Sequence, residues 1–316
     1  MAAADALQEA LEAVLGGSVA DLVRLSGGAS RETWAFRHAA PKGRGRDLIL
    51  RRDPPRSSRS GMDVEQDLLA AAATAGVPVP AVVAAGPAGG PLATAYLVME
   101  KIDGETIPRK ILRDETFADA RRLLAAQCGT ALAQIHSMPI EVIEAPAAPD
   151  EVAQWADMLH SLGQPHPAFE LAIRWLDANR PPPNEPVIVH GDFRNGNLMV
   201  GPDGLRAVLD WELAHRGDPI EDLGWLCAKS WRFGADPPVG GFGQYDDLIG
   251  AYQEAGGVRV DADALRWWEM LANLKWGIMS ILQTLAHTSG ATRSVELAAI
   301  GRRVCEVEWD LLEMLQ

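Results

Sequence analysis

Residues 187–211 read VIVHGDFRNGNLMVGPDGLRAVLDW, and they place a dense cluster of polar side chains between short apolar runs. The runs VIV, LMV and RAVL predict buried strands. GPDG at 201–204 predicts a hairpin turn that brings the second and third of these strands side by side. The loop that precedes the hairpin carries an imidazole, a carboxylate, a guanidinium and two amides. This composition indicates a reactive site rather than a simple turn.

Three side chains of this segment have the chemistry of a magnesium–phosphate site. The predicted hairpin brings Asp210 near Asn197. An amide oxygen and a carboxylate oxygen together suit Mg²⁺ and the phosphate oxygens that it binds. Asp192 then remains to accept the proton of a substrate hydroxyl. A basic Asp, an Asn shortly after it and a later metal-binding Asp form the residue pattern of phosphoryl transfer.

The wider pattern resembles a known superfamily. The catalytic segment of the aminoglycoside phosphotransferase and choline kinase superfamily is resembled by three stretches taken together. They are HGDFRNGNLMV at 190–200, LDWE at 209–212 and GDPIEDLGW at 217–225. The pattern is most similar to the kinase-like domain that is fused to some acyl-CoA dehydrogenases. The resemblance runs from about residue 20 to at least residue 290. It implies an α+β, protein-kinase-like fold of two lobes with ATP in the cleft between them.

The resemblance also implies a role for each polar residue. Asp192 matches the catalytic base, with a turn carboxylate that bonds its own loop as the alternative. Asn197 and Asp210 match the Mg²⁺ ligands. Arg194 has two open roles, either a contact to phosphate or an anchor of the loop. Three further residues match positions that hold the catalytic loop and the helix after it in place: His190, Asp218 and Asp222.

The first hundred residues predict a small, mostly antiparallel sheet with one inserted helix. LVRLSGGASRETWAFRH at 22–38 indicates a strand, a Gly-rich turn and a second strand. The inserted helix is expected to begin with Asp63 as its N-cap and to stop at Gly76. We therefore expect a nucleotide-binding lobe at 1–102. The remainder, 103–316, predicts a mainly helical lobe that carries the catalytic loop and the acceptor pocket.

Two groups of residues in the first lobe match nucleotide contacts. Gly27 and Gly28 allow close backbone approach to phosphates, and Ser30 can donate to them. In the segment AYLVMEKIDG, which resembles the hinge between lobes, Met99 is expected to lie behind the adenine. The carbonyl of Glu100 and the amide of Ile102 are expected to bond the purine edge.

The third predicted strand, LILRR, departs from the kinase pattern because it carries no Lys. Strand alternation places Arg51 at the phosphate-binding position. An Arg can bind phosphate through two parallel hydrogen bonds and keeps its charge. Glu65, on the next helix, is its expected partner, with a solvent-facing Glu65 as the alternative. The replacement of Lys also raises the alternative of a nucleotide-binding pseudokinase with a regulatory role.

The expected acceptor side is rich in aromatic and acidic residues. The aromatic side chains either pack in the core or form a pocket for a substrate with an apolar body; they are Trp225, Trp231, Phe233, Trp267, Trp268 and Trp276. The acidic side chains could hold an amine or could be surface charges; they are Asp236, Asp246, Asp247 and Glu269. The resemblance to the dehydrogenase-fused domain favours a hydroxyacyl or other apolar acceptor over an antibiotic.

Composition excludes several classes of function. The net charge is −14, which disfavours nucleic acid as a partner. No apolar run reaches the length of a membrane span, and the acidic start lacks the features of a signal peptide. The three cysteines lie far apart and are expected to be reduced, as in a cytoplasmic protein.

The segment LDWELAHRGDP leaves no room for an activation segment, which disfavours a protein kinase.

The sequence therefore predicts an ATP-dependent phosphotransferase, with GTP as an alternative donor and Mg²⁺ as the cofactor. The predicted reaction moves the γ-phosphoryl group to a hydroxyl of a small molecule.

Overall fold

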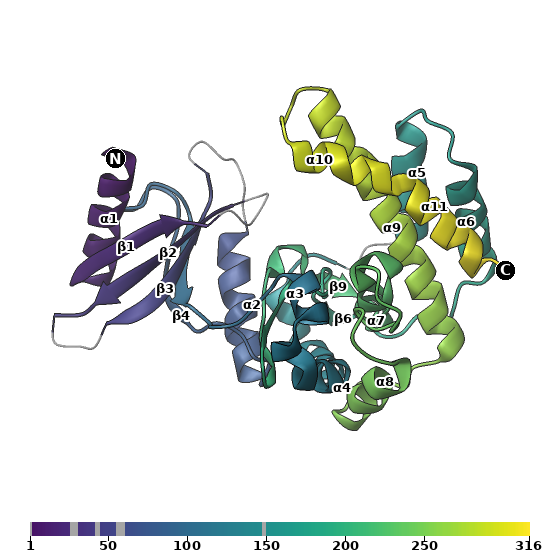
Figure 1. Ribbon diagram of the computed structural model, residues 1–316, viewed down its shortest axis with the longest axis horizontal. Helices are drawn as coiled ribbons and strands as arrows, with labels where there is room; N and C mark the ends of the chain where they lie inside the picture. Colours follow the sequence, from purple (N-terminus) through teal and green to yellow (C-terminus); the bar gives the residue numbers. More distant parts are fainter. Residues whose placement is uncertain (1, 26–30, 42–44, 55–60, 147–149) are drawn as a thin grey trace. The chain divides into compact units, whose positions relative to one another are not determined.

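The computed structural model describes residues 2–25, 31–41, 45–54, 61–146 and 150–316 (Figure 1). The chain divides into two compact units. The first comprises Met1–Gly104 and Arg206–Glu212, and the second comprises Glu105–Leu205 and Leu213–Gln316. The sequence predicts two contiguous lobes, 1–102 and 103–316. It does not predict that Arg206–Glu212 belongs to the first unit.

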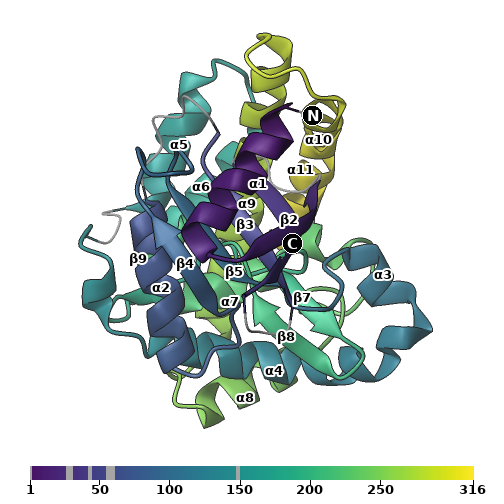
Figure 2. The same ribbon diagram turned by 90° about the vertical axis from the view of Figure 1, so that its left-hand side faces the viewer.

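The first unit is built on an antiparallel sheet with the strand order β1-β2-β3-β5-β4. Its strands are β1 (Ser18–Arg24), β2 (Glu32–Ala39), β3 (Arg46–Arg52), β4 (Val82–Gly86) and β5 (Tyr96–Glu100). Helix α1 (Ala2–Leu15) lies across one face of this sheet (Figure 2). Leu11 of α1 joins a buried cluster with Leu48 and Leu50 of β3. Because side chains alternate along a strand, Arg51 lies on the opposite face.

Helix α2 (Met62–Thr74) packs against β4 and β5. Its N-cap is Gly61, with a φ of 101°, and no side chain caps the helix. The expected Asp63 cap is therefore wrong. Asp63 lies in the first helical turn, where its charge still stabilises the helix dipole. The helix ends before Gly76, as expected, and the φ of 87° at that residue suits glycine.

The segment that returns to the first unit begins within β8 (Gly204–Val208), which forms a hairpin with β7 (Leu198–Gly201). The GPDG turn thus forms the hairpin that the sequence predicts. The amide of Val208 donates to the carbonyl of Pro78 at 2.8 Å, and Arg206 donates to the carbonyl of Asp103 at 2.9 Å. The short helix η3 (Trp211–Leu213) follows.

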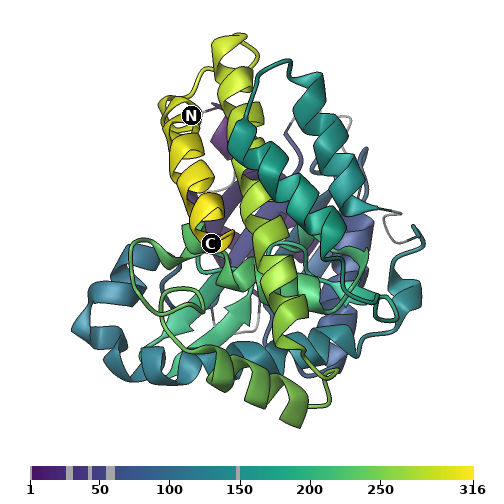
Figure 3. The ribbon, with the colours of Figure 1, turned by 90° about the vertical axis from the view of Figure 1, so that its right-hand side faces the viewer.

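The second unit is mainly helical, as expected. Its helices are α3 (Pro108–Arg113), η1 (Glu115–Phe117), α4 (Ala118–His136), η2 (Ile140–Val142), α5 (Glu151–Ser161), α6 (Pro167–Ala178), α7 (Ile220–Cys227), η4 (Lys229–Arg232), α8 (Tyr245–Glu254), α9 (Ala262–Thr288), α10 (Val295–Ile300), η5 (Gly301–Arg303) and α11 (Val304–Met314). Helix α9 runs through this unit and contacts α5, α6, α7, α10 and α11 (Figure 3). Strands β6 (Val187–Val189) and β9 (His215–Gly217) pair antiparallel. Among the described residues, no helix combines the length and apolarity that crossing a membrane requires.

Candidate active site

Asp192 lies in the loop between β6 and β7, and three side chains hold its carboxylate. Arg194 Nε and Trp225 Nε1 donate to Oδ1 at 2.8 and 2.9 Å. Asn197 Nδ2 donates to Oδ2 at 2.6 Å and to the backbone carbonyl of Asp192 at 3.0 Å. The side chain of Asp192 is 13% exposed. Hydrogen bonds to both carboxylate oxygens therefore fix the side-chain rotamer of Asp192.

The backbone of this loop is held by Asp222, whose side chain is fully buried. Its carboxylate accepts the amide of His190 at 2.7 Å and the amide of Gly191 at 2.9 Å. It also lies 3.3 Å from Nε2 of His136. These bonds fix the two residues that precede Asp192. The sequence predicts such a scaffold role for Asp222 but does not indicate His136.

Glycine is required at position 191 by both conformation and space. Its φ is 76°, in the left-handed region. A Cβ at this position would lie 2.4 Å from the carbonyl oxygen of Leu213. The chain can therefore turn tightly between His190 and Asp192 only with glycine there.

His190 is fully buried, and its Nδ1 accepts the amide of Asp192 at 3.2 Å. Because Nδ1 accepts, this ring carries its proton on Nε2 when neutral. Asp218 makes a separate anchor. It accepts the amide of Ile220 at 2.9 Å, at the start of α7, and the amide of Asn184 at 3.0 Å. The second bond ties the Pro-rich segment that precedes β6.

In the first unit, Arg51 forms the ion pair with Glu65 that the sequence predicts. Glu65 is only 2% exposed, which excludes its solvent-facing alternative. Arg51 also donates to Oδ1 of Asp210 at 2.8 Å. A second arginine, Arg31, pairs with Glu65 and lies 3.3 Å from Asp53. No local sequence pattern indicates Arg31 or Asp53, which lie 22 positions apart in the chain.

Asp210 has two further features of a ligand-binding residue. Its φ of 68° is unusual for a residue other than glycine, although Asp tolerates this region better than most. Its side chain is 38% exposed. Only one of its carboxylate oxygens accepts from Arg51, which leaves the other for a further partner.

The remaining residues expected to bind nucleotide lie in two places. Gly27, Gly28 and Ser30 lie outside the described residues. Met99 and Glu100 end strand β5, where Met99 is buried opposite Ile49 and the side chain of Glu100 is exposed. Ile102 follows the strand and is half-buried.

Comparison with known proteins identifies the family of this chain. The sequence profile described as the phosphotransferase enzyme family matches residues 21–268. The chain belongs to the phosphotransferase enzyme family. It is 28% identical to acyl-CoA dehydrogenase family member 10 of Mus musculus over 262 residues, or 77% of this chain. The chain spans about a quarter (24%) of the length of that relative.

Solved structures share the fold of this phosphotransferase. A protein from Ralstonia eutropha described as an aminoglycoside phosphotransferase has a TM-score of 0.74 at 22% identity, covering 96% of this chain and 98% of its own. A choline/ethanolamine kinase family protein from Mesorhizobium loti has a TM-score of 0.67 at 22% identity, with coverage of 99% and 94%. Spectinomycin phosphotransferase, in complex with ADP and spectinomycin, has a TM-score of 0.65 at 13% identity, with coverage of 98% and 98%. The phosphotransferase therefore has the kinase-like fold that its sequence implies.

The five tryptophans expected on the acceptor side are buried, whereas Trp309 of the same unit is 64% exposed. Trp225 and Trp231 lie with ring centroids 5.4 Å apart, and Trp231 and Trp276 with centroids 4.7 Å apart. The guanidinium of Arg194 lies 4.5 Å from the ring centroid of Trp231. Trp267 donates to the carbonyl of Leu176 at 2.8 Å, in the helical core. Arg194 therefore contacts both Asp192 and Trp231.

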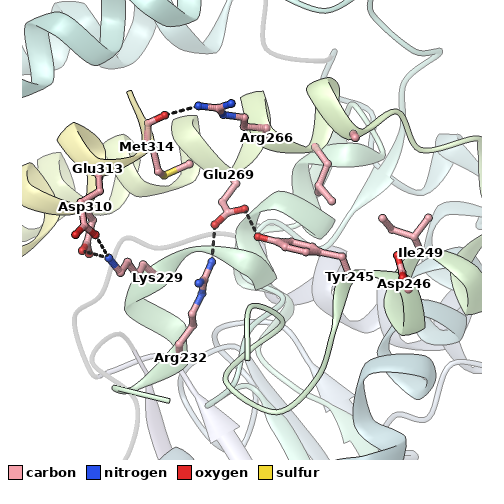
Figure 4. Close-up of a pocket in the computed structure, with 12 residues that line it drawn as sticks. Lys229, Arg232, Tyr245, Asp246, Ile249, Arg266, Glu269, Asp310, Glu313 and Met314 are labelled. Atoms are coloured by element: carbon pink, nitrogen blue, oxygen red, sulfur yellow. Dashed lines mark hydrogen bonds and ion pairs between the residues drawn. The ribbon is translucent and has the colours of Figure 1, made fainter. Parts of the chain in front are cut away.

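A pocket of about 580 Å³ opens in the second unit of the phosphotransferase (Figure 4). Its lining comes from η4, α8, α9 and α11, and Glu269 lies between Arg232 and Tyr245. The two partners are 2.6 and 2.7 Å from the carboxylate. Each carboxylate oxygen of Glu269 accepts one of these bonds, so a ligand amine would share the carboxylate with Arg232 and Tyr245. The other acids expected to hold an amine, Asp236, Asp246 and Asp247, are exposed.

Four charged groups form a cluster behind the catalytic loop. Lys275 Nζ lies 2.7 Å from Glu151 and 2.8 Å from Glu221. Glu221 also bonds Nε2 of His215 at 3.1 Å. Burial alone would lower the pKa of His215, but the hydrogen bond and the charge of Glu221 outweigh it and raise the pKa to about 9. Two carboxylates and a histidine lie together here, as in some metal sites. The ammonium group of Lys275 already supplies the positive charge that pairs with both carboxylates.

This cluster predicts a pH-dependent stability. Since the pKa of His215 rises above its usual value of 6.5, its protonated ring stabilises the fold below about pH 6.5, and this contribution is lost as pH rises through about 9. The side chain is 34% exposed, so solvent screening should reduce the contribution to about 1–2 kcal/mol. Urea denaturation at pH 6 and pH 10 should therefore show that His215→Gln loses less stability than the wild type over this range. Parallel losses in the two proteins would contradict the assignment.

Proposed function

We propose that this phosphotransferase moves the γ-phosphoryl group of ATP to a hydroxyl of a small molecule, with Asp192 as the general base. The observation that carries the proposal is the arrangement of bonds around the Asp192 carboxylate. Oδ1 accepts two hydrogen bonds, from Arg194 and Trp225, whereas Oδ2 accepts one, from Asn197. Oδ2 therefore retains a lone pair that can accept the proton of the acceptor hydroxyl.

The same bonds keep the Asp192 carboxylate oriented for proton transfer, and Arg194 places a full positive charge within hydrogen-bond distance of Oδ1. As the acceptor oxygen attacks the phosphorus, its proton passes to Asp192 and the bond from the γ-phosphorus to the β,γ-bridging oxygen breaks. The products are ADP and a phosphate monoester.

Mg²⁺ would be held by Asn197 and Asp210. The donor set fits this ion. The NH₂ group of Asn197 is directed to Asp192, which leaves its amide oxygen for a cation. Asp210 retains a carboxylate oxygen beyond its bond to Arg51. Bound Mg²⁺ would neutralise phosphate charge during the transfer.

Arg51 is proposed to contact the phosphates of the nucleotide from the first unit. Its pairing with Glu65 and Asp210 holds the guanidinium in place, as the corresponding Lys–Glu pair does in kinases. ATP is favoured as the donor because spectinomycin phosphotransferase, which has a similar fold, binds ADP. GTP remains the alternative donor. Gly27, Gly28, Ser30, Met99, Glu100 and Ile102 are proposed to complete the nucleotide site.

The second candidate function is a nucleotide-binding regulatory protein, which the Arg in place of Lys favours. A panel of hydroxylated compounds separates the two candidates. It should include hydroxyacyl compounds, which the dehydrogenase relative favours, together with choline, aminoglycosides and macrolides. We expect Mg²⁺- and ATP-dependent ADP release that rises with one acceptor class. Nucleotide binding without transfer to any acceptor would favour the regulatory protein.

A further inference from the structure

Trp225 does not behave as an ordinary core tryptophan. It lies on α7, is 3% exposed, and its indole N–H points to the Asp192 carboxylate rather than to a backbone carbonyl. Trp267, by contrast, is 4% exposed and donates to the carbonyl of Leu176. Two equally buried indoles therefore satisfy their N–H groups in different ways. Only the first of them contacts the residue that we assign as the base.

The ring of Trp225 also contacts the charged side chain of Lys275. Nζ of Lys275 lies 5.7 Å from the ring centroid, a distance typical of a cation–π contact. Lys275 is itself fixed between Glu151 and Glu221. A cation at the ring face draws electron density away from the indole nitrogen, which makes the N–H a stronger donor. The cluster thus supports the hydrogen bond to Asp192.

The bond also decides which oxygen of Asp192 is available. With Trp225 and Arg194 on Oδ1, the carboxylate cannot rotate about its Cβ–Cγ bond without losing two charge-assisted hydrogen bonds. Without the indole N–H, Arg194 alone would hold Oδ1. We propose that Trp225 is a positioning residue, whose indole N–H fixes the orientation of the Asp192 carboxylate for proton abstraction. The proposal rests on the proposed function.

Trp225→Phe tests this role, because it removes the N–H and keeps a ring for Lys275. With the acceptor found in the panel, we expect kcat to fall about 10- to 100-fold, the usual loss for a misoriented catalytic group. The KM for ATP should change less than twofold, because Trp225 bonds the assigned base rather than a residue that we assign to the nucleotide. Trp267→Phe is the matched control, since it also loses a buried indole hydrogen bond, and its kcat should stay within twofold of wild type.

An unchanged kcat in Trp225→Phe would overturn the proposal, as would equal losses in both variants, which indicate a packing role alone. A second measurement needs no acceptor. In the ¹H–¹⁵N spectrum, Trp225→Phe identifies the Trp225 indole resonance, and Asp192→Asn should shift that resonance upfield. If it does not move, the contact is absent and the proposal is wrong. If it moves but the wild type transfers phosphate to no acceptor, the proposed function fails while the contact stands.

Discussion

Asp192→Asn is expected to lower kcat by about 10²- to 10⁴-fold, the usual contribution of a general base. The amide has nearly the same shape as the carboxylate, but it cannot accept the proton of the acceptor hydroxyl. The fold should persist, because Asn can still accept hydrogen bonds through its oxygen at the position that Arg194 and Trp225 contact. The KM for ATP should change little. Steady-state kinetics with the identified acceptor measure both constants.

Asp119→Asn is the matched control for this variant, because it makes the same chemical change on a side chain that is 84% exposed. Its kcat should equal that of the wild type. If Asp192→Asn retained more than about a tenth of wild-type kcat, Asp192 would not be the base. The carboxylate would then be a structural part of its loop, the alternative that the sequence leaves open.

Asp222→Ala is expected to lower the free energy of unfolding by about 3–5 kcal/mol, the usual cost of removing one partner from a buried charged network. The carboxylate is fully buried and accepts the amides of His190 and Gly191. Alanine would leave both donors buried without an acceptor, at about 1–3 kcal/mol each. Urea denaturation at pH 7 measures the loss.

Two comparisons sharpen this experiment. Asp222→Asn keeps one acceptor oxygen and should lose less stability than Asp222→Ala. Asp119→Ala, on the exposed surface, should stay within about 0.5 kcal/mol of the wild type. A loss below about 1 kcal/mol in Asp222→Ala would show that the loop is held mainly by other contacts.

The parts of the site that sequence could predict are those with a local pattern. Strand alternation placed Arg51 on the face opposite the buried Leu48 and Leu50, and the next helix supplied Glu65. The hairpin of β7 and β8 followed from a four-residue turn. In each case, the residues that interact lie on neighbouring elements or share a regular period. Such relations can be read without knowing how distant segments meet.

The contacts that sequence reasoning missed join residues that are far apart in the chain. Glu151 and Lys275 are 124 positions apart, and His136 and Asp222 are 86 apart. The sequence places Trp225 either in the core or in an acceptor pocket, because nothing local shows where an indole N–H points. The wrong N-cap at Asp63 has a different cause, since the left-handed backbone of Gly61 begins the helix two residues earlier.

The most direct test of the central claim follows the fate of the γ-phosphoryl group itself. Wild-type protein is incubated with Mg²⁺, with the acceptor panel and with ATP that carries ¹⁸O in its γ-phosphoryl group. The masses of all products are then measured by mass spectrometry. Phosphoryl transfer predicts ADP and an acceptor that gains one labelled phosphoryl group on a hydroxyl. Label found only in unreacted ATP and inorganic phosphate, with every acceptor unmodified, would contradict it.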